Sequence, residues 1–286
     1  MDRRPLGATG MEVGIVSFGG IAVDGVTEGE AAEYVAEAIA GGVNYFDVAP
    51  SYGDAEARLG PALAPYRKNA YLACKTADRT AKGSRAELES SLRALRTDYL
   101  DVYQLHGLDG REDIEAAFGP DGAMETLLWA KESGYARFLG FTCHHEASAM
   151  EILGRYDGFA TMMAPINYAY CMRKGMGDAS LAECAARGMG VLAIKALARD
   201  KWPDWNAREH PRCWYRPIFG DPELGRLALN YALSKPVATV LPPGRMEFVR
   251  FALGVVGRQG GRHAPLTDGE YAYLRLKADE VSDLIF

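Results

Sequence analysis

Residues 70–105 read AYLACKTADRTAKGSRAELESSLRALRTDYLDVYQL and contain one complete strand–helix–strand unit. The runs 70–74 and 99–105 are mostly apolar, which is typical of strands that are buried on both faces of a parallel sheet. Between them, Ser84 and Glu87 have the spacing of a capping box in front of an amphipathic helix over residues 88–95. This stretch therefore predicts two parallel strands that are joined by a helix.

The same alternation continues in both directions along the chain. Mostly apolar runs recur with room for a helix between them, at residues 15–18, 43–47, 70–74, 99–105, 138–142, 161–166, 191–194 and 237–241. A capping box at Thr27 and Glu30 marks the helix after the first run. Eight strand–helix alternations predict an α/β fold, a single (β/α)8 TIM barrel that takes up residues 1–286 as one domain. A doubly wound sheet is the alternative, but Phe-Gly-Gly-Ile at residues 18–21 lacks the GxGxxG turn usual for that fold.

Three segments fall outside this alternation. Residues 3–12 predict an N-terminal β-hairpin that closes the bottom of the barrel, and a capping box at Thr267 and Glu270 opens an additional C-terminal helix over residues 271–281. Segment 198–221 is longer than most loops that follow a barrel strand. Its large aromatic residues are Trp202, Trp205, Trp214, Tyr215 and Phe219. We expect this segment to form a wall of a substrate pocket, the alternative being apolar cover for a helix end.

Composition and charge exclude several classes of protein. With 48% apolar and 24% charged residues, the chain is typical of a soluble globular protein rather than a disordered one. A net charge of −6 disfavours a nucleic-acid surface. The apolar runs are too short to cross a membrane, and the first residues lack the apolar core of a signal peptide. The five cysteines form no CxxC pair, which favours reduced, buried thiols. We therefore expect a cytoplasmic protein that binds neither nucleic acid nor membrane.

Polar side chains stand where neighbouring predicted strands end. Asp47, Lys75 and His106 end the second, third and fourth strands, and Tyr52 follows Asp47 by five residues. Active sites of such barrels lie at the C-terminal ends of the strands. A buried Lys75 requires an anionic partner, which Asp47 can supply, and a lysine beside Tyr52 is expected to lower the pKa of that phenol. With Tyr52 as general acid and a neutral His106 as orienting group, the set suits proton delivery to a carbonyl oxygen while a hydride reaches the carbon.

A metal site is an alternative to this interpretation. Asp109, His144 and His145 follow the fourth and fifth strands, where metal-dependent barrel hydrolases place ligands. No carboxylate–histidine pair shares a helix turn, however, and Lys75 would repel a cation nearby. No metal site is predicted, and a metal-dependent hydrolase is the least favoured alternative.

Four motifs give the chain a resemblance to a known family. They are RPLGATG at 4–10 with Gly19-Gly20, NYFDVAPSYG at 44–53 with Glu56, ACKT at 73–76 and TDYLDVYQLH at 97–106. Over nearly its whole length the chain resembles the aldo-keto reductase family. The resemblance implies an oxidoreductase that uses NAD(P)H to reduce an aldehyde or ketone to an alcohol, with Tyr52 as proton donor, Lys75 and Asp47 as its tuning pair, and His106 orienting the carbonyl. The alternative is a weakly catalytic or non-catalytic regulatory protein that binds the nucleotide.

The resemblance also implies cofactor contacts after the fifth to eighth strands. The residues expected there are Thr142, Cys143, Asn167, Lys195, Pro243, Gly244, Arg245 and Arg250. Arg250, with Arg245 as second candidate, is expected at an adenosine 2′-phosphate, so NADP(H) is favoured over NAD(H). Lys195 is expected as a polar wall of the site or else as half of a structural ion pair. Three departures, Met163, Ile194 and Gly254, each replace a family contact to the cofactor.

Overall fold

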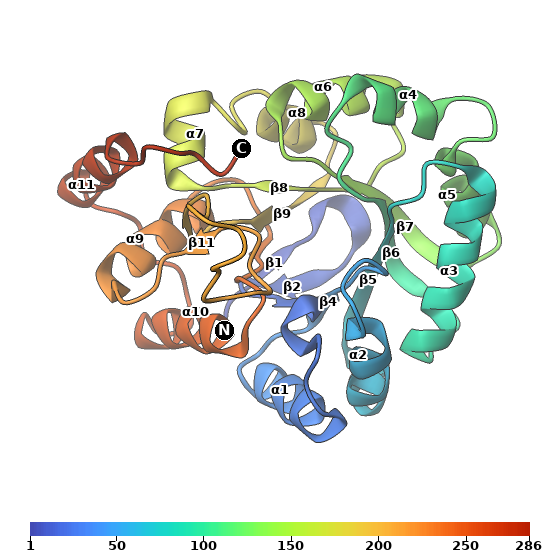
Figure 1. Ribbon diagram of the computed structural model, residues 1–286, viewed down its shortest axis with the longest axis horizontal. Coiled ribbons are helices and arrows are strands. Elements are labelled where there is room, and N and C mark those ends of the chain that lie inside the picture. Colours follow the sequence, from blue (N-terminus) through green and yellow to red (C-terminus); the bar gives the residue numbers. More distant parts are fainter.

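The computed structural model describes residues 1–286, and its centre is a closed parallel barrel (Figure 1). The eight strands, in their order around the barrel, are β3 (Phe18–Gly19), β4 (Tyr45–Asp47), β5 (Tyr71–Thr76), β6 (Leu100–Leu105), β7 (Ala136–Thr142), β8 (Thr161–Pro165), β9 (Gly190–Ile194) and β12 (Thr239–Val240). A parallel bridge between Val16 and Val240 joins the last strand to the first. The predicted (β/α)8 barrel is therefore confirmed.

Helices surround the barrel on its outside, as Figure 1 shows. They are α1 (Glu28–Ala40), α2 (Ala55–Leu63), α3 (Ala81–Leu95), α4 (Arg111–Phe118), α5 (Ala123–Glu132), α6 (Glu146–Arg155), α7 (Tyr168–Lys174), α8 (Ser180–Ala186), α9 (Pro222–Leu233), α10 (Met246–Arg258) and α11 (Asp268–Asp279). Helices such as α3, α5, α8 and α9 pack an apolar face on the strands, which explains why the strands are buried on both sides and mostly apolar.

Strand register decides which side chains reach the inside of the barrel. Asp47 pairs with Ala73 of the next strand, and Lys75 pairs with Gln104. Because side chains alternate along a strand, Ala73 and Lys75 point inward while Cys74 joins the outer core. The inward residues at the C-terminal end of the barrel are therefore polar, and this end carries the candidate site.

The opposite end of the barrel is closed by the predicted hairpin. Strands β1 (Arg3–Pro5) and β2 (Glu12–Gly14) pair antiparallel, and Figure 1 shows them inside the ring of strands. Leu6, Met11 and Val13 pack in the barrel interior. A Cβ on Gly190 would lie only 2.5 Å from Cδ1 of Leu6, so this close approach requires glycine.

Two of the three predicted capping boxes are present. Thr27 and Glu30 cap α1, and Thr267 and Glu270 cap α11, each with both reciprocal hydrogen bonds. The predicted C-terminal helix is therefore confirmed. It begins three residues earlier than the sequence indicated, because the capping threonine directly precedes it.

The capping box expected at Ser84 is wrong. Helix α3 begins at Ala81, and its cap is Thr80, whose side chain accepts a hydrogen bond from the amide of Gly83 at 3.0 Å. Glu87 instead accepts hydrogen bonds from the Thr76 hydroxyl and the Ala77 amide. Its carboxylate thus fixes the loop after β5.

Segment 198–221 folds back on itself, although residues 201–215 within it have no regular secondary structure. Two short strands, β10 (Ala198–Asp200) and β11 (Arg216–Pro217), pair antiparallel at its base. Arg216 Nε donates to Asp200 at 2.6 Å across this pair, and Trp202 Nε1 donates to the Cys213 carbonyl at 2.8 Å. The part between these strands reaches the C-terminal end of the barrel.

Two further features concern the chain as a whole. Its five cysteines are buried and form no disulfide, in agreement with the prediction from their spacing. None of its helices combines the length and the apolar character that crossing a membrane requires.

Candidate active site

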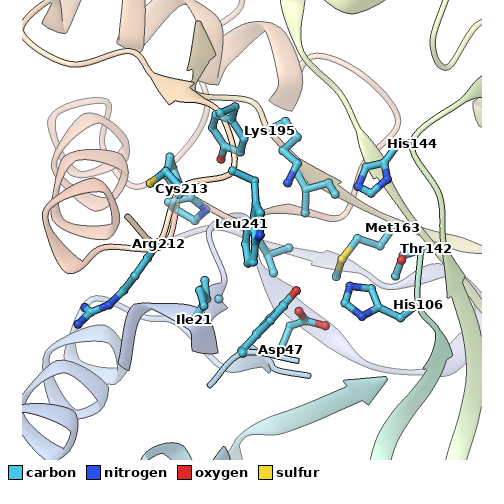
Figure 2. A pocket seen from close by; sticks show the side chains of 18 of the residues that line it. Ile21, Asp47, His106, Thr142, His144, Met163, Lys195, Arg212, Cys213 and Leu241 are labelled. Atoms are coloured by element: carbon cyan, nitrogen blue, oxygen red, sulfur yellow. The ribbon is translucent and has the colours of Figure 1, made fainter. Parts of the chain in front are cut away.

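A cavity of about 370 Å³ opens at the C-terminal end of the barrel (Figure 2). This volume lies in the range usual for small-molecule sites. Strands contribute Asp47, Lys75, Thr142, Met163 and Ile194 to its walls, and the residues that follow the strands contribute Tyr52, His106, His144, Lys195, Leu241, Pro243 and Gly244. Segment 198–221 adds Arg212, Cys213, Trp214 and Tyr215, and the chain end adds Ile285 and Phe286.

A buried ion pair lies at the floor of this cavity. Lys75 Nζ donates to the carboxylate of Asp47 and, at 3.1 Å, to the carbonyl of Val48. Gln104 Nε2 donates to the other carboxylate oxygen at 3.1 Å. Both charged side chains are almost fully buried, with exposed fractions of 1% for Lys75 and 3% for Asp47. The partner that the sequence assigned to Lys75 is therefore the one it contacts.

Tyr52 and His106 lie next to this pair. The Tyr52 hydroxyl is 3.4 Å from Lys75 Nζ, a long hydrogen bond, and Lys75 Nζ is 5.0 Å from the centre of the Tyr52 ring. The rings of Tyr52 and His106 meet edge to face, with 5.9 Å between their centres. The structure thus brings together all four side chains that the sequence singled out at the strand ends.

Burial dominates the protonation of these groups. It lowers the pKa of His106 to about 3, with the charge of Lys75 acting in the same direction, so the imidazole is neutral near pH 7. Burial alone would lower the pKa of Lys75, but Asp47 and Tyr52 together outweigh burial, and the pKa of this ammonium is raised. The expectation of a lowered pKa for Tyr52 is wrong, because burial outweighs the opposing effect of Lys75 and raises it. The cavity therefore presents a phenol, an ammonium and a neutral imidazole, which together can donate a proton to an oxygen atom.

Three positioning contacts escaped the sequence reasoning. Gln104 holds Asp47, as described above. Arg79 donates to the carbonyls of His106 and Gly107 at 2.9 and 3.0 Å, and Thr142 Oγ1 accepts from the Gly107 amide at 2.7 Å. These contacts fix the backbone at His106. Of these residues, only Gln104 could have been noticed in the sequence, because it is a polar residue within a mostly apolar run that is predicted to be a buried strand.

Two expected cofactor residues lie outside the cavity. Cys143 is fully buried in the core between barrel and helices. The side chain of Asn167 caps α7 by accepting from the Tyr170 amide, and its amide group donates to the carbonyls of Lys195 and Ala198. Because every polar atom of Asn167 is engaged in this way, it has none left for a ligand. The expectation of cofactor contacts from these two side chains is therefore corrected.

The expected phosphate-binding residues lie at a second cavity next to the first. This cavity has about 350 Å³ and is lined by Tyr34, Pro211, Arg212, Arg245, Met246, Glu247 and Arg250. Arg212 lines both cavities. Arg250 makes two hydrogen bonds of 2.8 Å to Glu37, and Arg245 Nε is 2.9 Å from Glu247. Such exposed ion pairs contribute little to stability, so an anionic ligand can compete with Glu37 and Glu247 for the two arginines.

Two of the family departures face the main cavity. Met163 and Ile194 line it, so a thioether and a branched aliphatic chain stand where the sequence comparison expected polar and aromatic contacts. Gly254 lies in α10, outside both cavities. Lys195 lines the main cavity and forms no ion pair, so the structural ion pair considered for it is wrong.

The residues considered as metal ligands are engaged with other partners. The Asp109 carboxylate binds the ring and the backbone amide of His144, and His145 Nδ1 lies 3.0 Å from the Tyr170 hydroxyl. The His144 ring stacks on Phe286 with 4.3 Å between ring centres. No group of three or more potential ligands is assembled anywhere in the chain.

The fold is a parallel barrel that carries a buried aspartate–lysine pair, a tyrosine and a histidine at the C-terminal ends of its strands. A sequence model of the Aldo/keto reductase family matches residues 11–213. The chain therefore belongs to the aldo/keto reductase family.

The chain is also similar to individual relatives and, in its fold, to a solved structure. The chain is 31% identical to the 6-dehydroglucose reductase of Novosphingobium aromaticivorans, over 69% of its own length and 73% of that protein. It is 30% identical to the uncharacterized oxidoreductase YqkF of Bacillus subtilis, and this match spans about half of each chain, 50% and 49%. In fold it is similar to the holo form of the aldo-keto reductase AKR11C1 from Bacillus halodurans, with a TM-score of 0.73, 23% identity and coverage of 97% and 96%.

Proposed function

We propose that this protein reduces an aldehyde or ketone to an alcohol with NADP(H) as cofactor. The observation that carries the proposal is the buried contact of Lys75 with both Asp47 and Tyr52, next to a neutral His106. An ammonium of this kind, at the floor of a cavity, stabilises a phenolate that forms when a neighbouring tyrosine gives up its proton. The four side chains together are suited to protonating an oxygen atom.

Each side chain has a defined part in the proposed reaction. A carbonyl oxygen placed between Tyr52 and His106 accepts a hydrogen bond from the neutral imidazole and the proton from the Tyr52 hydroxyl. When bound, the nicotinamide cofactor supplies the hydride that adds to the carbonyl carbon. The C=O bond thereby becomes a CH–OH group, and Tyr52 is left as a phenolate beside Lys75. Asp47 keeps Lys75 charged and in place throughout.

The residues around the two cavities fit a dinucleotide that carries phosphates. The backbone of Pro243 and Gly244 borders the main cavity, and Arg212 connects it to Arg245 and Arg250 in the second. Arginine matches phosphate with paired donors, so these side chains suit the pyrophosphate and an adenosine 2′-phosphate. Thr142 lines the cavity where the nicotinamide amide is expected.

The proposal is tested by following NADPH oxidation with a panel of aldehydes and ketones, together with fluorescence titration of NADPH. We expect tight NADPH binding and turnover of at least one carbonyl compound. The absence of both NADPH binding and turnover would contradict the proposal. NADPH binding without turnover would favour the regulatory alternative. Met163 and Ile194 support that alternative, because each replaces a residue that is expected to contact the nicotinamide.

The choice of cofactor is tested at Arg250. We expect Arg250→Met to raise the KM for NADPH about 10–100-fold, because a charge-assisted pair to a phosphate is worth about 1.5–3 kcal/mol. The KM for NADH should change little, since NADH lacks the 2′-phosphate. Arg258 is an exposed arginine on the same helix, so Arg258→Met is the matched control. It should change neither the KM for NADPH nor the KM for NADH. An equal rise in the KM for NADPH and for NADH would mean that Arg250 does not bind the 2′-phosphate.

A further inference from the structure

The main cavity has two ends of different character. One end is bordered by Ile21, Arg212 and Gly244, and Arg212 continues into the second cavity with its arginines. The other end is bordered by His144 and Phe286. A dinucleotide with phosphates fits the first end, because it leads to the remaining cations. The second end therefore belongs to the substrate, an assignment that rests on the proposed function.

Lys195 is a cation without a counter-ion on the wall of this cavity. No carboxylate lies within 4.0 Å of its ammonium group, whose nearest aromatic neighbours are Tyr215 at 4.8 Å and Trp214 at 5.3 Å. Lys195 is half-buried, and withdrawing an unpaired ammonium from water costs more free energy than contact with two aromatic faces restores. Lys195 also has a φ of +64°, a backbone conformation that residues other than glycine rarely adopt. A strained and unpaired cation of this kind points to a ligand that it is built to meet.

His144 is held rigidly at the same end of the cavity. Asp109 binds both its Nδ1 and its backbone amide, and Phe286 stacks on its ring. Nε2 is therefore the ring nitrogen that stays free, and it donates a hydrogen bond to an anion in the doubly protonated ring, whose charge the Asp109 carboxylate balances. In Figure 2, His144 and Lys195 lie on the side of the cavity away from Asp47.

The charges that line the cavity are strongly unbalanced. Lys75, Lys195 and Arg212 are basic, whereas Asp47 is the one acidic side chain among the lining residues and it already binds Lys75. The side chains that line the cavity thus offer Lys195 no free anion.

We propose that Lys195 and His144 bind an acid group of the substrate, so that this enzyme prefers carbonyl compounds that carry a carboxylate or a phosphate. The sequence predicts Lys195 at the cofactor, and the geometry assigns it to the substrate instead. The carbonyl group would then lie between Tyr52 and His106, and the acid group would reach toward the opposite wall. Substrates without an acid group would leave the Lys195 charge unpaired.

The test compares substrates that differ only in the acid group. Succinic semialdehyde is paired with butanal, and glyceraldehyde phosphate with glyceraldehyde, for the wild type, Lys195→Met and His144→Gln. We expect the preference for the acidic member, measured as a ratio of kcat/KM, to fall about 10–100-fold in Lys195→Met, as the loss of a charged hydrogen bond implies. Lys201→Met, an exposed lysine of the same segment, should leave the ratio unchanged. The pair that responds identifies the acid group as carboxylate or phosphate.

Two results would overturn the proposal. One is an unchanged ratio for both pairs. The other is an equal loss on all four substrates together with weaker NADPH binding, which would assign Lys195 to the cofactor. If the wild type turns over no substrate, the proposed function fails, but the binding site is still tested by calorimetry of succinate and inorganic phosphate with the NADP-loaded protein. Binding that is lost in Lys195→Met supports the acid-binding site, and binding that is equal or absent in both proteins contradicts it.

The acid-binding site also predicts a pH dependence. Burial lowers the pKa of Lys195 to about 8, with Lys75 acting in the same direction and Cys213 and Asp109 in the opposite one. Lys195 is therefore charged below pH 8 and becomes neutral above it. We expect the kcat/KM ratio of acidic to neutral substrate to fall about tenfold between pH 7 and pH 9. The ratio should be flat over this range in Lys195→Met, because His106 is already neutral and Tyr52 is still protonated.

Discussion

Tyr52→Phe is expected to lower kcat for carbonyl reduction by about 10²–10⁴-fold, the usual contribution of general acid catalysis. The substitution removes a single oxygen atom, which lies 3.4 Å from Lys75 Nζ and makes no other hydrogen bond. Cofactor binding should be preserved, because the phosphate-binding arginines and the backbone of Pro243 and Gly244 are untouched. The free energy of unfolding should change by less than about 1 kcal/mol, as a long hydrogen bond contributes little.

Stopped-flow measurement of NADPH oxidation, with NADPH titration in parallel, distinguishes loss of chemistry from loss of binding. Tyr103→Phe is the matched control, because it removes a buried hydroxyl from β6 that binds the Ser84 carbonyl at 3.1 Å and does not line the cavity. It should leave kcat within about twofold of the wild type. A Tyr52→Phe variant that retains most of its kcat would exclude this phenol as the proton donor.

The part of the site that could be predicted from the sequence is the part that strand ends determine. Asp47, Lys75 and His106 each interrupt or end a buried apolar run, and in a parallel barrel such ends converge. The fold follows from the same runs, because eight strands that are buried on both faces require helices around them. No knowledge of long-range contacts was needed for either inference.

The wrong predictions concern the direction of a single side chain, the hydrogen bonds of a single residue and the pKa of a single group. Thr142 and Cys143 are adjacent, but successive side chains of an extended chain point in opposite directions, so Thr142 faces the cavity and Cys143 the outer core. Asn167 follows a strand and caps the next helix: its Oδ1 accepts from the Tyr170 amide, and its Nδ2 donates to the carbonyl of Ala198. The pKa of Tyr52 depends on how deeply the fold buries it, which the local sequence does not reveal.

Contacts between distant segments could not be predicted at all. Asp109 and His144 are 35 residues apart and meet because β6 and β7 are neighbours in the barrel. Phe286 reaches the cavity only because α11 packs on α7 and α9 and directs the chain end inward. The unpaired charge of Lys195, on which the acid-binding proposal depends, is likewise visible only once every neighbouring side chain has been placed.

Lys75→Met is expected to lower the free energy of unfolding by about 3–5 kcal/mol, the usual cost of leaving one half of a buried ion pair without its partner. Asp47 would keep only the hydrogen bond from Gln104 Nε2, at an exposed fraction of 3%. Turnover should also be lost, because nothing would then stabilise the Tyr52 phenolate. Urea unfolding followed by circular dichroism measures the first effect, and NADPH oxidation the second.

The double variant Asp47→Asn/Lys75→Met separates the two roles of this pair. It removes both charges, so most of the lost stability should return, since neutral replacement of a buried ion pair costs little. Activity should not return, because the phenolate still lacks its ammonium. A double variant as unstable as Lys75→Met would show that packing around the substituted side chain, rather than the unpaired carboxylate, causes the loss.

The pH dependence of the single variant gives an independent check on the unpaired carboxylate. Burial raises the pKa of Asp47, and Lys75 opposes this rise, so without Lys75 the folded-state pKa is higher still. A carboxyl group whose pKa is higher in the folded than in the unfolded state takes up a proton on folding as the pH falls. The stability deficit of Lys75→Met should therefore be largest above neutral pH and should narrow as the pH falls toward 5. A deficit that does not vary with pH would mean that the Asp47 charge is not its cause.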